Sequence, residues 1–529
     1  MFLPSFQSDE SVYVYSGFAL SKGIIPYREI LLGHPPLMYI TYAAIVQLCG
    51  SSLSAIRLFT AILFSVTVFQ TFILSKILLG RSEKQKYAII ASFFYSIFPF
   101  NFFLRLSITG TLDIILIFFI LNSCIAYTIF CKSKNLKLLF LAGLFMGCAL
   151  MTTLRALFFI IPLLLFHIVN TWHNHINGYK PIFTSTSILL LGNVIPVAMV
   201  LSYVTFVWNA LPNFLSELFY LQSIMMQMTY EEKLRNLVWV LSILLPPIFL
   251  GSLGSIFRIK KASNERNFLI ILPEIICLSS VFLIGTIPRT IFPHYFLFLT
   301  PFLSFLAAMG LCKVVNDIIR IRLNRLSPKQ IFLSPRTAMA LVFLLGFSFL
   351  SGFQTVYFLR NDVIGEFGAH AFKISQYDQA EYEVARLITN VTSSSDKIWT
   401  SEGAIAFLAQ RLILPPNSSD WPIVCFFPEF LGYVQKMGSW ELEYRGDEIK
   451  DYHTGLLTIN QFTQSWETNK VKVIVFITGT GWVPYPDTLL YEGFRGQQGA
   501  KNYVQQKYEL KWNITVPNNP YAYQIWIRK

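Results

Sequence analysis

Apolar residues form long runs along the chain between residues 53 and 357. The runs at 53–79 and 182–207 approach or exceed the about 20 residues that a helix needs to cross a bilayer. Because lipid offers no hydrogen bonds to the backbone, runs of this length indicate helices, which satisfy their own backbone polarity. The pattern predicts ten spans, at 53–79, 88–104, 113–130, 138–152, 154–170, 182–207, 237–257, 268–287, 294–312 and 338–357.

Composition places the chain in the membrane class. Of its 529 residues, 54% are hydrophobic and 13% are charged, and the mean hydropathy is +0.52. Soluble chains carry about 25% charged residues, so this chain has too little charge to solvate a globule of its size. We therefore expect a polytopic α-helical membrane protein with a helical bundle over residues 53–357.

The net charge of +13 orients the bundle rather than indicating a nucleic-acid partner. Lys and Arg gather in alternate loops, at 81–86, 132–137, Lys180, 258–266 and 313–336. Loops rich in Lys and Arg stay on the cytoplasmic side of a membrane. Residues 1–52, a first loop with the acidic pair and interfacial helices, and the tail after the last span are therefore expected on the extracytoplasmic face.

The tail, assigned to residues 358–529, has a mixed polar composition that is typical of a folded domain. Its patterns predict an α/β domain with helix 376–391, strand 397–401, helix 402–410, strand 471–478 and a terminal hairpin of 508–516 with 521–527. Three N-x-S/T sequons lie in the tail, at Asn390, Asn417 and Asn513. Acceptor sites of this kind favour an extracytoplasmic location.

An adjacent pair of carboxylates, Asp9 and Glu10, opens the first extracytoplasmic segment, and a His34-Pro35-Pro36 turn follows. Such a pair has two interpretations. It is a solvated loop or helix N-terminus, where carboxylates are favourable against the helix dipole, or it is part of a functional site. Charged residues at the next extracytoplasmic turns favour the functional interpretation.

Arg105 and Asp113 bracket a polar strip between two apolar spans. Asp113 enters a helix that is otherwise almost wholly apolar, and ionisable groups at membrane depth are costly and usually functional. The alternative is that Asp113 caps this span with help from Thr111. Arg155, between two short spans, is either a snorkelling side chain or a cation that holds a lipid phosphate.

Arg289 and His294 form a further group near the span 294–312. For His294 alone, a hydrogen-bonded interfacial histidine is the simpler interpretation. Together, the carboxylates and arginines converge at one end of a helical bundle, beneath a folded domain. This arrangement suits a substrate with an apolar tail in the bilayer and an anionic head at its surface, which favours a lipid phosphate.

The candidate residues occur in a distinctive order along the chain. In sequence they are Asp9-Glu10, Ala19-x-x-x-Gly23-x-x-Pro26-Tyr27, Gly33-His34-Pro35-Pro36-Leu37-x-Tyr39, Arg57-Leu58, Asp113, Arg155 and Pro293-His294-Tyr295. With this order the chain resembles the GT-C-fold glycosyltransferases that use lipid-phosphate sugars. These are the protein mannosyltransferases dependent on dolichyl-phosphate mannose and the aminoarabinose transferases, of glycosyltransferase family 39. The family usually has a basic residue before the prolines, where this chain has His34.

The resemblance implies an enzyme that moves a sugar from a polyprenyl or dolichyl phosphate carrier to an acceptor protein, lipid or glycan outside the cytoplasm. It implies inversion at the anomeric carbon, with Asp9 as general base. Glu10 would position the acceptor, and Asp113 would orient donor or acceptor hydroxyls. The candidates for binding the donor phosphate are Arg105, Arg155, Arg289, His34 and His294.

Phosphate is a competent leaving group, so the chemistry requires no cofactor or metal, although an acid-rich site can bind a divalent metal. Cys425 is the only cysteine of the tail, and no CxxC pair or His/Cys spacing predicts a structural zinc site. The expected location is a cell membrane, crossed several times, or the endoplasmic reticulum membrane in a eukaryote.

The chain departs from the family in one respect. Family members have a transmembrane helix before the acidic pair, whereas here eight residues precede Asp9, too few to span a bilayer. We expect that the true start lies upstream, that the chain is a fragment, or that the first helix has been lost. A catalytically inactive scaffold is the alternative function. A transporter is a weaker one, because we see no inverted repeat and the acidic residues lie near span ends.

Overall fold

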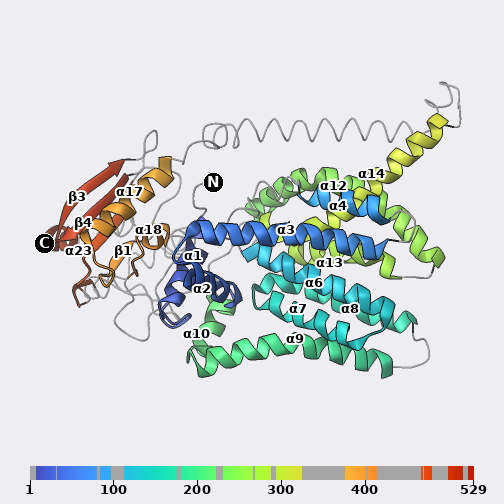
Figure 1. Ribbon diagram of the computed structural model, residues 1–529, viewed down its shortest axis with the longest axis horizontal. Coiled ribbons are helices and arrows are strands. Elements are labelled where there is room, and N and C mark those ends of the chain that lie inside the picture. The colour runs from blue at the N-terminus through green and yellow to red at the C-terminus, as the bar shows by residue number, and fades with distance from the viewer. Residues whose placement is uncertain are drawn as a thin grey trace.

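The computed structural model of the protein is a bundle of long helices with a smaller sheet-containing domain at one end (Figure 1). The structure describes residues 8–30, 32–79, 84–96, 112–174, 180–221, 230–265, 268–286, 293–323, 376–400, 403–413, 466–468, 470–478, 499–515 and 522–529. The predicted span 338–357, the sequon at Asn417 and the tail cysteine Cys425 lie outside the described residues.

Six helical segments of the described chain are long and apolar enough to cross a membrane, which confirms the polytopic helical class. They lie in α3 (Leu53–Leu78), α6 (Leu112–Ser133), η1 (Leu154–Ala156) with α8 (Leu157–Asn174), α9 (Lys180–Phe206), η3 (Phe268–Ile271) with α13 (Leu272–Thr286), and η4 (Pro293–Leu299) with α14 (Thr300–Leu323). Shorter apolar helices are α2 (Leu37–Cys49), α7 (Leu136–Leu150) and the segment Pro247–Ile256 of α12 (Tyr230–Glu265). The described part of the predicted span 88–104 is helical in α4 (Lys84–Ser96).

One predicted loop is helical instead. Residues 258–265, assigned to a basic cytoplasmic loop, continue α12, and Arg258 is buried rather than solvated. Its Nε donates to Glu274 Oε1 of α13 over 2.7 Å. The prediction was wrong here because Arg and Lys are good helix formers, so their presence does not end a helix. The buried carboxylate also gives Arg258 a partner that hydropathy does not reveal.

Helices α7 and α9 pack closely because glycines line their contact. A Cβ atom at Gly143 would overlap the carbonyl oxygen of Leu189, and one at Gly192 would overlap the carbonyl oxygen of Phe140. Gly147, one turn from Gly143, meets α9 in the same way. Lipid is as apolar as a leucine side chain, so membrane helices associate through such close packing rather than through the hydrophobic effect.

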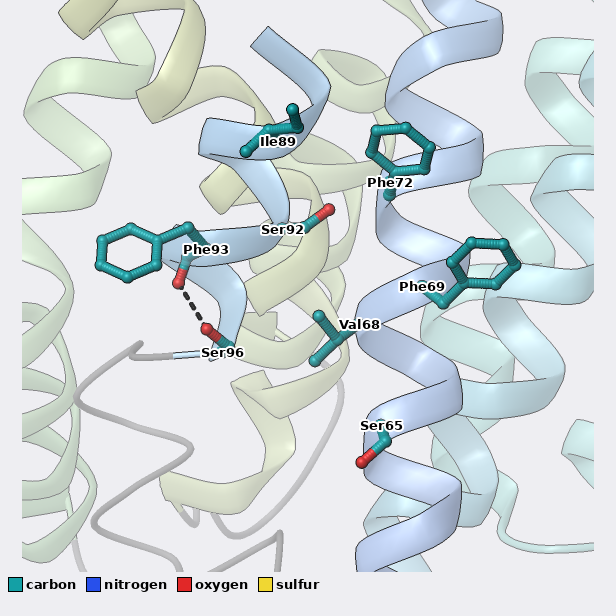
Figure 2. Close-up of a pocket in the computed structure, with 8 residues that line it drawn as sticks. All are labelled: Ser65, Val68, Phe69, Phe72, Ile89, Ser92, Phe93 and Ser96. Atoms are coloured by element: carbon teal, nitrogen blue, oxygen red, sulfur yellow. Dashed lines mark hydrogen bonds between the residues drawn. The ribbon is translucent and has the colours of Figure 1, made fainter. Parts of the chain in front are cut away.

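A shallow groove of about 370 Å³ lies between α3 and α4, lined by Ser65, Val68, Phe69, Phe72, Ile89, Ser92, Phe93 and Ser96 (Figure 2). Its serine hydroxyls donate to carbonyls of their own helices; Ser96, for example, donates to Phe93 O over 2.8 Å. The groove therefore presents an apolar surface with satisfied polar groups. Nothing in its lining supplies charge or a catalytic side chain.

The segment before the first span forms two helices, α1 (Ser8–Ser21) and α2. The two pack closely, since a Cβ atom at Gly17 would lie 2.5 Å from Tyr42 Cβ. A hydrophobic core that is separate from that of the bundle interior joins both helices to the tail, with Phe18, Tyr39 and Ile388 among its buried members.

The tail has the predicted C-terminal sheet-containing domain. Its elements are α17 (Gln376–Val391), β1 (Ile398–Thr400), α18 (Gly403–Leu408), β2 (Val473–Thr478), α23 (Gly499–Lys507), β3 (Tyr508–Thr515) and β4 (Ala522–Arg528). The sheet order is β1-β2-β4-β3; β1 pairs with β2 in parallel, and the other two pairs are antiparallel. Strand β2 is central and reads VIVFIT because a central strand is covered on both faces.

Candidate functional site

The acidic pair begins α1, and its second member is fully buried. Arg57, in the second turn of α3, holds the Glu10 carboxylate with two hydrogen bonds, from Nε to Oε1 over 2.9 Å and from Nη2 to Oε2 over 2.7 Å. The Ser52 side chain caps α3 by accepting from Ala55 N–H, which fixes the start of this helix. A bidentate pair sets both the position and the rotation of the carboxylate.

A second buried pair joins Asp113, in the first turn of α6, to Arg155 in η1. Arg155 Nη1 donates to Asp113 Oδ1 over 2.9 Å, and both side chains are buried. The Thr153 hydroxyl caps this turn by accepting from Arg155 N–H over 3.4 Å. The Arg155 guanidinium lies 5.1 Å from the centre of the Tyr295 ring, a cation–π distance. Asp113 and Tyr295 thus fix the guanidinium of Arg155.

Tyr42 of α2 carries a buried hydroxyl group in the vicinity of both pairs. Its hydroxyl hydrogen-bonds with Thr60 and lies within electrostatic reach of both Glu10 and Asp113. The side chain is fully buried. We call Glu10, Arg57, Tyr42, Asp113, Arg155 and His34 the charged cluster.

His34 joins the cluster from the loop between α1 and α2. Its Nε2 lies 3.3 Å from the Tyr13 hydroxyl, and its carbonyl oxygen accepts from the Tyr27 hydroxyl over 2.8 Å. Nδ1 of His34 is buried and has no hydrogen-bond partner among the described residues. Although part of the residue is exposed, loss of solvent around the ring and the charge of Arg155 lower the pKa of His34 to about 3. The ring is therefore neutral at pH 7.

Two side chains from a distant segment fix this loop. Glu217, in the π-helical turn η2 (Ser216–Leu221), accepts from Leu32 N–H over 2.7 Å. Asn213, in α10 (Leu211–Leu215), donates from Nδ2 to Tyr27 O over 2.9 Å. Tyr27 has a positive φ of 62°, which these contacts help to hold. Burial raises the pKa of Glu217 well above its usual range, although the Leu32 N–H opposes that shift.

The structure does not describe the side chains of four predicted site residues. Asp9 belongs to the first turn of α1, directly before Glu10, and His294 belongs to η4 beside Tyr295. Their backbones are described, and their side chains are not. Arg105 and Arg289 lie outside the described residues.

The structure brings four predicted residues together, namely Glu10, His34, Asp113 and Arg155. Sequence reasoning gave Arg57 and Glu217 no role in the site. Arg57 had a visible signal, since it is the charged residue near the start of an apolar run. Glu217 had a weaker one, as a lone carboxylate in the apolar stretch 211–221.

No group of three or more His, Cys, Asp or Glu side chains in the described part of the chain is arranged to hold a metal. The two described carboxylates of the cluster each face an arginine, which competes with a cation for the same oxygens. That the chemistry requires no metal stays a prediction.

Comparisons with known proteins place this geometry in context. Residues 33–200 match the sequence profile of the family described as dolichyl-phosphate-mannose-protein mannosyltransferase. This region contains His34, Arg57, Asp113 and Arg155 of the charged cluster. A search of curated proteins found no match to the sequence.

Solved structures match over nearly the whole chain. ArnT from Cupriavidus metallidurans bound to undecaprenyl phosphate matches with a TM-score of 0.58 at 13% identity, covering 99% of this chain and 94% of that one. The Archaeoglobus fulgidus oligosaccharyltransferase AglB, in complex with an inhibitory peptide and a dolichol-phosphate, matches with a TM-score of 0.51 at 13% identity, covering 99% and 70%. The same organism's oligosaccharyltransferase in complex with Zn and sulfate matches with a TM-score of 0.50 at 12% identity, covering 99% and 69%.

The helices and the structural matches show that this is a multi-pass membrane protein of the GT-C fold. The resemblance noted in the sequence is confirmed: residues 33–200 match the mannosyltransferase profile, and the fold matches along the chain.

Proposed function

We propose that the protein is a membrane glycosyltransferase that moves a sugar from a polyprenyl or dolichyl phosphate carrier to an acceptor protein, lipid or glycan, with inversion. The observation that carries the proposal is Arg155. Its guanidinium is fixed by Asp113 and Tyr295 at the end of the bundle where α1 and α2 lie. A fixed cation of this kind suits the charge that develops on a departing lipid phosphate.

The acidic pair supplies the base in this proposal. As the acceptor attacks the anomeric carbon, its proton passes to the Asp9 carboxylate, and the bond from sugar to lipid phosphate breaks with its electrons on the phosphate oxygen. Glu10, held by Arg57, fixes the turn of α1 that carries Asp9. Asp113 acts by orienting Arg155, in addition to any contact with donor or acceptor hydroxyls.

The remaining predicted phosphate ligands, Arg105, Arg289 and His294, stay candidates. His34 has a lowered pKa, so we propose that it contributes as a neutral hydrogen-bonding group rather than as a cation. Its buried Nδ1 has no partner among the described residues, so one ring nitrogen remains for a substrate atom.

The proposed face of action is extracytoplasmic. Lys132, Lys134 and Lys137 lie where α6 meets α7, and Arg155 lies at the opposite end of α7. The positive-inside rule assigns the lysine end to the cytoplasm, which leaves the charged cluster and the tail outside. The sequon residues Asn390 and Asn513, which are exposed in the tail, agree with this assignment.

The test is release of polyprenyl phosphate from labelled polyprenyl-phosphate sugars by membranes that contain the protein and an acceptor extract. We expect the wild-type chain to release lipid phosphate and Asp9→Asn to abolish the release. Asp396→Asn is the matched control, since it makes the same change in a tail carboxyl that pairs with Lys472 at the surface. Equal release by wild type and Asp9→Asn would overturn the role of Asp9. No release across several sugars would overturn the transferase.

A further inference from the structure

Helix α1 lies between the charged cluster and the tail domain. One face meets the cluster, through Glu10 with Arg57 and through Tyr13 with His34. The other face packs against α18 of the tail, beside which it lies in Figure 1. The helix thus joins the cluster to a distant part of the chain, since Tyr15 of α1 and its tail partner Ile413 are 398 residues apart in sequence.

The contact between α1 and the tail is specific. The Phe18 and Phe407 rings meet edge to face with centroids 5.9 Å apart, and each is 1% exposed. The Tyr15 hydroxyl accepts from the Ile413 N–H over 2.8 Å, and the Tyr15 side chain is fully buried. An aromatic contact and a buried hydrogen bond fix both the position of α1 and its rotation about its own axis.

The distance along α1 from this contact to the acidic pair is short. Tyr15 lies five residues after Glu10, which corresponds to about 7.5 Å of helix rise. Isolated helices of fewer than about 12 to 15 residues are marginal in water, and α1 has 14 residues. The helix therefore depends on its neighbours for order, and α18 is one of the two that pack most extensively on it; the other is α2.

We propose that the tail domain positions the acidic pair through α1, with Phe407 and Tyr15 as positioning residues. The tail is then part of the site's geometry rather than a separate module. This inference rests on the proposed transferase function. Neither residue touches substrate in this proposal; both act by holding the helix that carries Asp9 and Glu10.

The expected signature is a loss of turnover without a loss of donor binding. Displacing a reacting group by about 1 Å can cost about 10²-fold in rate. We expect Phe407→Ala to lower kcat for release of lipid phosphate by about tenfold or more. The KM for the lipid donor should stay within about twofold, because α18 is not part of the charged cluster. Phe407→Leu, which keeps apolar bulk against Phe18, should restore most of the lost kcat.

The experiment combines these kinetics with hydrogen exchange of the α1 amides, measured on the intact protein in detergent. Trp399→Ala is the control for general weakening of the tail, because the Trp399 ring packs edge to face against Trp466 within the tail domain. Tyr15→Phe is a milder second variant that deletes only the hydroxyl. Its control is Tyr508→Phe, which removes a tail hydroxyl that donates to Val471 O over 2.9 Å.

Faster exchange of α1 and reduced kcat in Phe407→Ala and Tyr15→Phe, with neither change in the two controls, would support the inference. Wild-type exchange of α1 in both test variants, or an equal loss of kcat in Trp399→Ala, would overturn it. The exchange measurement is independent of turnover. A wild-type protein that releases no lipid phosphate would therefore contradict the proposed function, while α1 exchange would still decide whether the tail holds this helix.

Discussion

The charged cluster and the Arg258–Glu274 pair have the same chemistry in different surroundings. All three ion pairs concerned are buried, with nitrogen–oxygen distances between 2.7 and 2.9 Å. Arg258 of α12 and Glu274 of α13 are 16 residues apart in sequence. The other neighbours of the Arg258 guanidinium are the Ile270 carbonyl and the Phe305 ring. That pair ties α12 to α13.

The pairs of the cluster lie among loop residues and hydroxyl groups instead. The charge of Arg155 acts on His34, and the charges of Glu10 and Asp113 act on the Tyr42 hydroxyl. A buried ion pair is weak support for stability, because desolvation cancels much of its attraction. It is equally weak as a sign of function when considered alone. What distinguishes the cluster is the convergence of the loop that carries His34, the Glu10 and Asp113 carboxylates and two arginines at one end of the bundle.

Replacing one arginine from each setting gives the largest expected difference. We expect Arg155→Met to lower release of lipid phosphate at saturating donor by about 10³-fold, because a preorganised donor to developing charge is lost. Arg258→Met removes a comparable buried cation. It should destabilise the protein by about 3 kcal/mol, while release per folded molecule stays within about twofold.

The measurements for this pair are initial rates in membranes and unfolding in detergent, with the folded fraction of each variant determined separately. The matched variants separate catalysis from folding. If both substitutions reduced release equally, the functional role proposed for the cluster would be contradicted, because the α12–α13 pair would then matter as much for release.

A double-mutant cycle on Glu10 and Arg57 gives the next largest effect. Either Glu10→Gln or Arg57→Met removes half of a bidentate pair, and we expect each to cost about 3 kcal/mol of stability. The double variant removes both charges and should be more stable than the sum of the single effects predicts. Release of lipid phosphate should remain low in the double variant, because α1 lacks its anchor.

The readout of the cycle is the free energy of unfolding in mixed detergent micelles. Strictly additive losses would mean that the two side chains are not energetically coupled. Recovery of both stability and release in the double variant would mean that the pair has no positioning role.

Elements with a strong local pattern were predictable. The bounds of α17 agree with the predicted helix 376–391 because its apolar residues follow a clear helical period. The tail hairpin of β3 with β4 was also predicted. Successive side chains of a strand point to opposite faces of the sheet, which leaves an alternating pattern in the sequence. The pattern did not reveal α23, whose nine residues are mostly polar.

The site was only partly predictable, because its pairings are not local. Glu10 and Arg57 are 47 residues apart, and Asp113 and Arg155 are 42 apart. The sequence identifies each charged residue as unusual in its setting, but helix packing decides which partners meet. Arg258 is the converse case, because helix packing buries a residue that the sequence assigned to a basic cytoplasmic loop.

Glu217 gives a smaller effect than the ion pairs and a more specific one. Burial raises its pKa above the ordinary value of 4.5, so the folded protein keeps a proton that the unfolded chain releases. The stability from this group is therefore complete below about pH 4.5 and is lost as the pH rises through the raised value. Glu217→Gln stays neutral at every pH and can still accept from Leu32 N–H. We expect its unfolding midpoint to fall less than that of wild type as the pH rises above 4.5.

Asp396 provides the contrast, because its pKa is lowered by the Ser393 N–H and by Lys472. The stability that Asp396 contributes is present at neutral pH and is lost as the pH falls, which is the opposite of the Glu217 effect. Asp396→Asn should therefore reduce the loss of stability on acidification. The Asp396 effect should be small, since this pair is largely solvated. Unfolding midpoints measured across the pH range in both variants distinguish stability that is lost at high pH from stability that is lost at low pH. An unchanged pH slope in Glu217→Gln would mean that Glu217 is ionised in the folded protein, and the loop that carries His34 would then be held by a buried charge.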